Sequence, residues 1–477
     1  MKIVLVHPAG SNWFPGKKDI TPLANRMAPL GLLSLAAYLE KKGGHKVGIL
    51  DCLGPDASPD TDKNTRTIID MKPDLVGFTA TTSSFPDAAY MAESIKRELP
   101  SVITIAGGVH VSSLGATLLK EAGGMDMLCT GEGEETLAEV ASGREPKSIN
   151  GLAFRDNGKT RQNPPRVQLP EMDSLPFPAY HRLRGFPHEY RLPLFSYTKT
   201  PGASFVTSRG CPFTCSYCDR SVFGRSYRFN SAEYTFEHFK FLKREFSVRH
   251  VTIYDDLFTV NKKRIFELCD MLASSDMDME FNCAVRIGSV DMDLLRALKA
   301  GGCLMVSFGI ESGHQPLLDR HKAGVKLEQV RKTVAMAKQA GLWVKGLFMV
   351  GLPGETDESI RKTGDFAQSL DLDDLNYSKF TPFPGAPVWA DIESHGEFIQ
   401  DWRLMNCLNF VFRPNEIESF DRLEDLYREQ VSRFYSSKSW RKKLMKRAFV
   451  HRNSLWRLLR NLPDFIAAKK NFQGHAT

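Results

Sequence analysis

The sequence predicts an α/β protein in three parts: an N-terminal doubly wound, Rossmann-like domain, a partial TIM-like barrel of six β/α units, and a C-terminal, mainly helical region. Apolar strand patterns alternate with helical patterns over residues 1–142, and a second such series follows a proline-rich stretch. Beyond residue 396 the pattern is helical and finally basic. Because 477 residues exceed one compact core, we expect domains at 1–142, 196–395 and 396–477, with a linker over 143–195.

The N-terminal domain opens with the strand "KIVLV" and continues with "KVGILD", "DLVGFTA", "VITIAGG" and "MDMLCTG". Helical patterns separate these strands, beginning with one at about 29–42. Five such units favour a parallel sheet covered by helices on both faces. Ligands of these sheets bind at the carboxyl ends of the strands. The segments "FTATTSS" (78–84) and "IAGGVH" (105–110) fall at those ends.

The second alternating series predicts the barrel. Prolines in "QNPPRVQLPEMDSLPFPAY" indicate that a wrapped linker precedes it. Catalytic groups in a barrel of parallel strands come from the C-terminal strand ends. We expect its strands at 204–208, 250–255, 280–286, 304–310, 344–350 and 375–381.

The bulk composition is that of an ordinary globular protein. No leader pattern opens the sequence, and no apolar run approaches the ~18 residues of a membrane-spanning helix, so we expect a cytoplasmic protein. The net charge of +7 is local, because ten Lys/Arg and no Asp/Glu lie between Arg433 and Arg460. This basic end, interleaved with Trp and Leu, predicts either peripheral contact of residues 433–460 with an anionic membrane or a solvated helix packed on the barrel.

Three of the nine cysteines lie within eight residues, in "SRGCPFTCSYCDR", as Cys211, Cys215 and Cys218. In a reducing compartment this pattern favours metal binding over disulfides. Three thiolates can hold three irons of a cubane cluster and leave the fourth iron open. A structural zinc site needs a fourth ligand, and the candidates His188 and His238 lie at no finger-like spacing. The other six cysteines, scattered among apolar neighbours, are expected to be buried small hydrophobes.

The motif "CPFTCSYC" resembles the CxxxCxxC signature of the radical S-adenosylmethionine (SAM) enzymes. The resemblance implies a 4Fe-4S cluster held by Cys211, Cys215 and Cys218, shielded on one face by Tyr217. It implies that the open iron chelates SAM, and that an electron from an external donor of the flavodoxin or ferredoxin type cleaves SAM to a 5′-deoxyadenosyl radical. Burial and hydrogen bonds to sulfur set the potential of such clusters.

The resemblance continues along the barrel and implies which residues hold SAM. In "IYDDLF" it assigns the methionyl amine to Asp255 and Asp256, and in "CAVRIG" it assigns the carboxylate to Arg286. The motif "SFGIESG" places Glu311 and Ser312 at the ribose or amine. The motif "GLFMVGLPGET" places Gly351 and Pro353 at the adenine. Taken singly, such acids, arginines and turns are more often structural; the order along six strands supports the resemblance.

The N-terminal domain resembles a cobalamin-binding domain, whose signature is DxHxxG, a Ser/Thr region and a Gly-Gly pair. "LVHPAG" supplies His7 but has Leu5 where the signature has Asp, so the acidic partner of a ligating histidine is missing from its usual place. His7 is therefore expected to line the cofactor's lower face without binding cobalt, or to be a plain strand-end histidine, rather than a ligand. The remaining positions implied for cobalamin are Thr79, Thr82, Gly107 and Gly108.

The paired domains resemble cobalamin-dependent radical SAM enzymes, which implies methylation of an unactivated carbon in a small-molecule or lipid-like substrate. An oxidative cyclase of the magnesium-protoporphyrin monomethyl ester type is the nearest alternative. A methylthiotransferase of tRNA fits less well, because residues 1–142 lack a second cysteine cluster. A non-catalytic cobalamin sensor has no need for a reducible cluster. No nucleic acid partner is expected.

Overall fold

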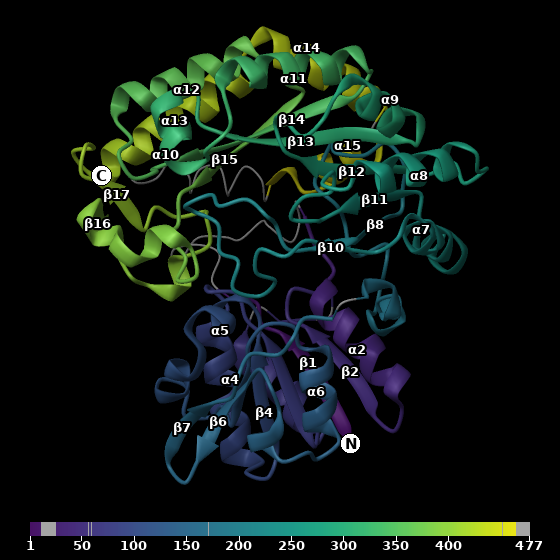
Figure 1. The fold of residues 1–477 in the computed structure, drawn as a ribbon, viewed down its shortest axis with the longest axis vertical. Coiled ribbons are helices and arrows are strands. Elements are labelled where there is room, and N and C mark those ends of the chain that lie inside the picture. Colours follow the sequence, from purple (N-terminus) through teal and green to yellow (C-terminus); the bar gives the residue numbers. More distant parts are fainter. Residues whose placement is uncertain (11–24, 56, 59, 170, 451, 464–477) are drawn as a thin grey trace.

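The computed structural model describes residues 1–10, 25–55, 57–58, 60–169, 171–450 and 452–463. Two α/β bodies lie one above the other in Figure 1, with the N-terminal body below and the barrel above. The carboxyl ends of the lower sheet face the barrel. Among the described residues, no helix has the length and apolar character needed to cross a bilayer.

The lower body is built on a seven-stranded sheet in the order β2-β1-β3-β4-β5-β6-β7. Its first five strands pair in parallel, which confirms the predicted doubly wound sheet. These strands are β1 (Lys2–His7), β2 (Lys46–Asp51), β3 (Leu75–Thr79), β4 (Ile103–Gly107) and β5 (Met127–Cys129). An antiparallel hairpin, β6 (Leu152–Asp156) and β7 (Lys159–Gln162), extends the sheet at the β5 edge. No strand was expected in this proline-flanked part of residues 143–195.

Helices cover both faces of this sheet and bury separate apolar cores. On one face α2 (Leu30–Lys42) and α6 (Glu134–Ala141) pack over Leu5 and Ile105. On the other face three helices pack over Val4 and Phe78: α3 (Thr61–Asp70), α4 (Phe85–Glu98) and α5 (Val109–Leu114). Successive side chains of a strand point to opposite faces of the sheet, and helices cover both faces here. The strands are therefore apolar along most of their length.

The upper body is a half-barrel of six parallel strands in the order β15-β14-β13-β12-β11-β8. All six strands predicted from the sequence are present: β8 (Gly202–Phe205), β11 (His250–Ile253), β12 (Glu280–Val285), β13 (Cys303–Glu311), β14 (Trp343–Val350) and β15 (Asp374–Lys379). Helices cover its outer face: α7 (Ala232–Phe246), α8 (Lys262–Ala273), α9 (Met292–Ala300), α10 (Gln315–His321), α11 (Leu327–Gln339) and α12 (Asp357–Ser369). Side-chain caps start several of them, such as Ser231 at α7 and Asp291 at α9.

The C-terminal region is mainly helical, as predicted. Its helices are α13 (Phe420–Tyr435), α14 (Lys438–Val450) and α15 (Arg452–Arg460). A small antiparallel pair, β16 (Gly396–Phe398) and β17 (Phe412–Pro414), precedes them. A second pair, β9 (Ser208–Arg209) and β10 (Arg228–Phe229), lies between the two bodies. Short 3-10 helices occur at Gly115–Lys120, Pro146–Ser148, Met172–Ser174, Tyr180–Arg182, Pro387–Ser394 and Trp402–Leu404.

Candidate cofactor sites

The cysteine loop begins where β8 leaves the barrel sheet, and the Asp255 carboxylate holds its approach. Oδ1 of Asp255 accepts hydrogen bonds from the backbone N–H groups of Thr207 (2.5 Å) and Ser208 (3.1 Å). Oδ2 accepts hydrogen bonds from the hydroxyls of the same two residues, at 2.6 and 2.7 Å. Asp255 is buried. These four hydrogen bonds occupy both carboxylate oxygens of Asp255. The neighbouring Asp256 is exposed.

Gly210, directly before the first cysteine, has a backbone that requires glycine. Its φ is +86°, and a Cβ there would lie 2.0 Å from the carbonyl oxygen of Ser226. The Gly210 N–H donates to Oδ2 of Asp256 at 3.2 Å, and partial desolvation raises the pKa of Asp256. The antiparallel pairing of β9 with β10 closes the base of the loop. The loop that carries the cysteines is therefore fixed at its start and at its end.

The three cysteines lie together in this loop, Cys215 buried and Cys211 and Cys218 partly exposed. A hydrogen bond from the Cys218 thiol, together with the nearby cations, lowers the pKa of Cys215 and favours its thiolate, the form that binds iron. Within the described part of the chain, no three His, Cys, Asp or Glu side chains converge on one metal ion. The three cysteines of a cubane cluster bind three different irons, so their sulfurs do not have to point at a single metal ion.

Arg286 lies against the cysteine loop. Its Nη1 donates to the sulfur of Cys215 at 3.7 Å, and its guanidinium lies 3.8 Å from the centre of the Phe213 ring. Its Nη2 donates to the carbonyl oxygen of Ala323 at 3.0 Å. Tyr217 packs against an apolar cluster that includes Leu352 and Phe380. Arg286 thus brings a positive charge to the sulfur of Cys215.

Glu311 and Lys322 form a second charged pair beside the loop. Lys322 Nζ is 2.8 Å from Oε1 of Glu311 and 2.8 Å from the carbonyl oxygen of Gly309. Glu311 has a φ of +67°, and the register of β13 against β14 shifts between Gly309 and Glu311. Non-glycine residues are uncommon in this region of backbone conformation. The sequence reasoning identified Glu311 but missed Lys322.

The motif after β14 is held by hydrogen bonds that the sequence reasoning did not anticipate. Glu355 accepts hydrogen bonds from the N–H groups of Gly351 and Leu352, at 2.5 and 3.2 Å. His321 Nε2 is 2.8 Å from the carbonyl oxygen of Pro353. A carbonyl only accepts, so Nε2 carries the proton, and Nδ1 accepts from the Ser216 hydroxyl at 2.7 Å. His321 therefore joins the cysteine loop to this motif.

Ser312 and Gly351 have mainly structural surroundings. The Ser312 hydroxyl is buried, lies 3.2 Å from Oγ1 of Thr363 and accepts from the N–H of His314 at 3.1 Å. Gly351 has a φ of +95°, and a Cβ there would come within 3.2 Å of the Phe410 ring. The backbone conformation of Gly351 thus accounts for its glycine whether or not adenine binds nearby.

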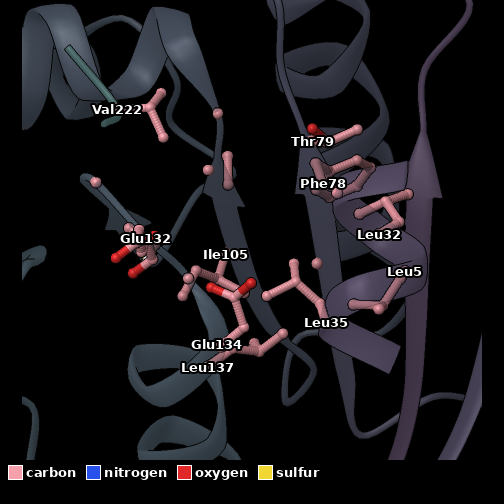
Figure 2. A pocket seen from close by; sticks show the side chains of 18 of the residues that line it. Leu5, Leu32, Leu35, Phe78, Thr79, Ile105, Glu132, Glu134, Leu137 and Val222 are labelled. Carbon is pink, nitrogen blue, oxygen red and sulfur yellow. The ribbon is translucent and has the colours of Figure 1, made fainter. Parts of the chain in front are cut away.

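A cavity opens on the α2 and α6 face of the lower sheet, and Figure 2 shows its lining. Its empty space, the open mouth included, is about 730 Å³. Thr79, Gly107 and Gly108, three of the positions implied for cobalamin, line it; Thr82 is buried outside the lining. A Cβ at Gly31 would meet no atom within 4 Å and would enter the cavity. We call this space the glycine-lined cavity; its other glycines are Gly77, Gly131 and Gly133.

His7 lies at the carboxyl end of β1 and has an acidic partner after all. Its Nδ1 is 2.8 Å from Oδ1 of Asp51, a buried residue at the end of the neighbouring strand β2. No acidic partner of His7 was expected, because Leu5 stands where the signature has Asp. The structure corrects this expectation, since the partner comes from the neighbouring strand. Leu5 itself lines the glycine-lined cavity, and His7 is not among its described lining residues.

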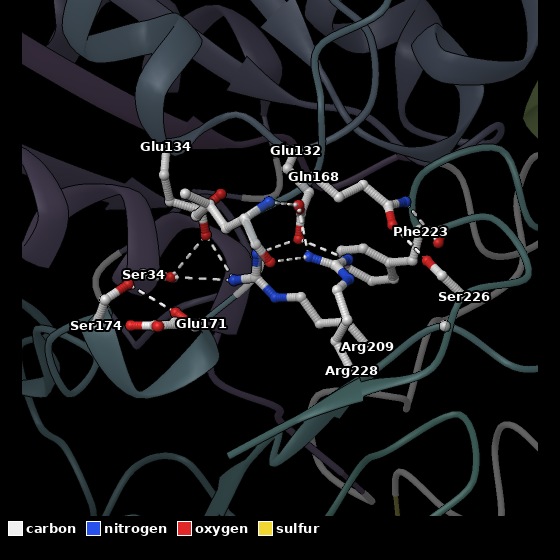
Figure 3. Close-up of polar contacts among 12 residues, drawn as sticks. Ser34, Glu132, Glu134, Gln168, Glu171, Ser174, Arg209, Phe223, Ser226 and Arg228 are labelled. Carbon is white, nitrogen blue, oxygen red and sulfur yellow. Dashed lines mark hydrogen bonds and ion pairs between the residues drawn. The ribbon is translucent and has the colours of Figure 1, made fainter.

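Four charged side chains join the two bodies, as Figure 3 shows. Arg209 Nη1 is 2.7 Å from Oε1 of Glu132, and Arg209 Nη2 is 2.5 Å from Oε1 of Glu134. Arg228 Nη1 is 2.9 Å from Oε2 of Glu132. Burial alone would raise the pKa of Glu134, but the charge and hydrogen bond of Arg209 and the hydroxyl of Ser34 lower it overall.

Two family models match the chain: the radical SAM superfamily over residues 205–367 and the B12 binding domain over residues 16–141. An uncharacterized methyltransferase of Pyrococcus horikoshii is 33% identical over 445 residues, which are 91% of this chain and 92% of the relative. An anaerobic magnesium-protoporphyrin IX monomethyl ester cyclase of Rubrivivax gelatinosus is 27% identical over 453 residues, 92% of this chain and 78% of the relative.

Solved structures share the fold. The radical SAM methyltransferase TsrM of Kitasatospora setae, with tryptophan and a SAM analogue bound, matches with a TM-score of 0.65 and 20% identity, covering 82% of this chain and 76% of that one. The cobalamin-dependent SAM radical enzyme OxsB, with aqua-cobalamin and SAM bound, matches with a TM-score of 0.64 and 19% identity, covering 79% and 52%.

The chain therefore belongs to the radical SAM superfamily, among the members that carry a B12 binding domain. It is an enzyme whose cofactors are a 4Fe-4S cluster, SAM and cobalamin, as the sequence predicted. The residues present fit these groups. The loop offers three thiols, one of them favoured as the thiolate, and a side chain at Gly31 would enter the open cavity of the lower sheet.

Replacing Asp255 tests its role in holding the cysteine loop. Asp255→Asn keeps the size of the side chain but removes its charge, so that four hydrogen bonds to a charged group, each contributing about 1.5–3 kcal/mol, become neutral ones of about 0.5–1.5 kcal/mol. We expect the iron bound per chain after anaerobic reconstitution to fall to roughly half or less. Asp270→Asn, an exposed change on α8, is the control. Equal iron content in both variants would contradict this role.

The buried Glu355 makes stability depend on pH. Burial raises its pKa from 4.5 to about 8, so between these values the folded chain holds a proton that the unfolded chain has lost. The stabilisation is complete below pH 4.5 and disappears as the pH rises through 8, with a slope of up to about 1.4 kcal/mol per pH unit. Glu355→Gln should remove this slope from the free energy of unfolding measured in urea. Parallel pH profiles for the two proteins would refute the assignment.

Proposed function

We propose that this enzyme methylates an unactivated carbon of a small or lipid-like substrate. The observation that carries the proposal is the shared wall between the cofactor regions. Arg209, directly before Gly210 and Cys211, lines the glycine-lined cavity together with Phe223 from the same loop. When bound, the cluster and SAM supply a radical that removes hydrogen from carbon, and cobalamin supplies a methyl group. Relatives named as methyltransferases support this reaction.

We propose the following division of work among the residues. Cys211, Cys215 and Cys218 hold the cluster, with Tyr217 against its face. Asp256, Arg286 and Glu311 surround SAM, since their charged groups gather beside the cysteine loop. The roles of Ser312, Gly351 and Pro353 at the nucleoside, and of His7, Thr79, Thr82, Gly107 and Gly108 at cobalamin, stay predictions. Asp255 holds the loop, because its oxygens are already engaged.

An oxidative cyclase is the second candidate, because a relative of that name matches 92% of this chain. Both reactions begin with removal of hydrogen from carbon, so the same cysteine loop serves either. They differ in the fate of the substrate radical: methylation adds one carbon to the product, and ring formation adds none. The identity of the product therefore decides between them.

The reaction is tested with SAM that carries a ¹³C-labelled methyl group. Anaerobically reconstituted protein with hydroxocobalamin and dithionite is incubated with lipid and small-molecule fractions of a cell extract. We expect 5′-deoxyadenosine together with a product heavier than its precursor by one labelled CH₂. The variant with alanine at Cys211, Cys215 and Cys218 should form neither. Deoxyadenosine formed with a product that has lost hydrogen and gained no label would favour the cyclase and reject methylation.

We further propose that α14 and α15 contact an anionic membrane surface. Met445, Val450, Trp456 and Leu459 are all at least half exposed, among the cations counted between residues 433 and 460. The alternative, a helix packed on the barrel, is also met in part, because the Arg447 guanidinium of α14 lies 4.7 Å from the ring centre of Trp343. A cytoplasmic location and a flavodoxin-like or ferredoxin-like electron donor also remain proposals.

Vesicle binding tests the membrane contact. The full chain should sediment with vesicles of phosphatidylcholine and phosphatidylglycerol, and much less with phosphatidylcholine alone, because the anionic lipid attracts the basic helices. The double variant Trp456→Ala, Leu459→Ala should lose most of this binding. Val167→Ala, at a residue that is 85% exposed elsewhere, is the control. Binding that is unaffected by the double variant would reject α15 as the contact.

A further inference from the structure

The buried ion network between the two bodies has an arrangement that stability alone does not explain. Arg209 belongs to the barrel and Glu132 and Glu134 to the lower body, yet their charged groups meet at 2.7 and 2.5 Å. The two guanidinium side chains are 11–12% exposed and the two carboxylate side chains 5%. Apolar residues of similar size stabilise a buried position as well as ion pairs do. These ion pairs also join residues of the two bodies at defined distances.

Residues of this ion network line two cavities. Glu132, Glu134, Arg209 and Phe223 line the glycine-lined cavity. Arg209 and Phe223 also line a second cavity, whose wall includes Ser208, Tyr254 and Asp256 on the barrel side. The Arg209 guanidinium lies 5.4 Å from the centre of the Phe223 ring. The stacked pair therefore lies in the partition between the space on the lower sheet and the space at the barrel strands.

The backbone next to the first cysteine is held from both sides of this partition. On the barrel side, Asp255 binds the N–H and hydroxyl of Ser208, and Asp256 binds the N–H of Gly210. On the other side, Glu132 and Glu134 bind the side chain of Arg209, which lies between Ser208 and Gly210 in the sequence. The residues that lead into Cys211 are therefore in contact with groups on both sides of the partition.

We propose that Arg209 is a positioning residue that couples occupancy of the glycine-lined cavity to the conformation of the cysteine loop. Cobalamin and the iron–sulfur cluster then bind with positive coupling, since ordering the shared wall for one of them lowers the ordering cost for the other. Coupling of this kind is reciprocal. The inference rests on the assignment of the cavity to cobalamin, and it adds a thermodynamic link between the two sites that neither cofactor requires by itself.

The experiment compares hydroxocobalamin binding to the full chain before and after cluster reconstitution, by anaerobic equilibrium dialysis. We expect reconstitution to tighten the Kd of wild-type protein at least about fivefold. In Arg209→Met this ratio should fall to about one. The double variant Arg209→Met, Glu134→Leu should behave in the same way and leaves no carboxylate unpaired, because Glu132 keeps Arg228. Addition of hydroxocobalamin should also change the electron paramagnetic resonance spectrum of the reduced cluster in wild type and not in these variants.

Arg166→Met is the matched control. Arg166 is similarly buried and pairs with two glutamates, Glu135 and Glu139, within the lower body. It should keep the wild-type ratio of Kd values. A ratio of Kd values of one in wild type, or the wild-type ratio in both Arg209 variants, would overturn this inference and leave the cobalamin assignment standing. Failure of wild-type protein to bind hydroxocobalamin at all would overturn the inference together with the cobalamin assignment.

Discussion

The loop between Thr207 and Asn230 has to be held from two directions, and much of the structure depends on that constraint. Parallel sheets present their ligand-binding residues at the carboxyl ends of their strands, and in this protein the edge of the lower sheet faces the barrel. The loop with the three cysteines fills the seam. On the barrel side it is bound by Asp255 and Asp256, and on the other side by Glu132 and Glu134.

Charged side chains of opposite sign are paired at this seam. Buried charges are costly unless they are paired and hydrogen-bonded, and here Arg209 is matched by glutamates and Lys322 by Glu311. Glu311 and Gly210 both have positive φ values. Apolar strands between capped helices form the two bodies on either side of the seam.

Prediction from the sequence succeeded where the signal is local and failed where two distant segments had to be paired. The barrel strands were found because each is a short apolar run followed by a helix. The β6–β7 hairpin was missed because prolines flank it. Asp51 was missed as the partner of His7 because the two residues are 44 positions apart and meet only when β1 and β2 pair. The role of His321 depends likewise on contacts with Ser216 and Pro353.

The amino-acid sequence alone shows the features that carry the chemistry of this protein: three thiols at fixed spacing, two series of β/α units and glycines at strand ends. Spacing and periodicity are properties of neighbouring residues, so they can be read along the chain. The partners of the acidic side chains depend on the folded arrangement of the chain. The same is true of the contacts of Arg209 with residues 75 and 77 positions away in the other body. Such contacts arise from the packing of one sheet edge against another, and no local pattern specifies that geometry.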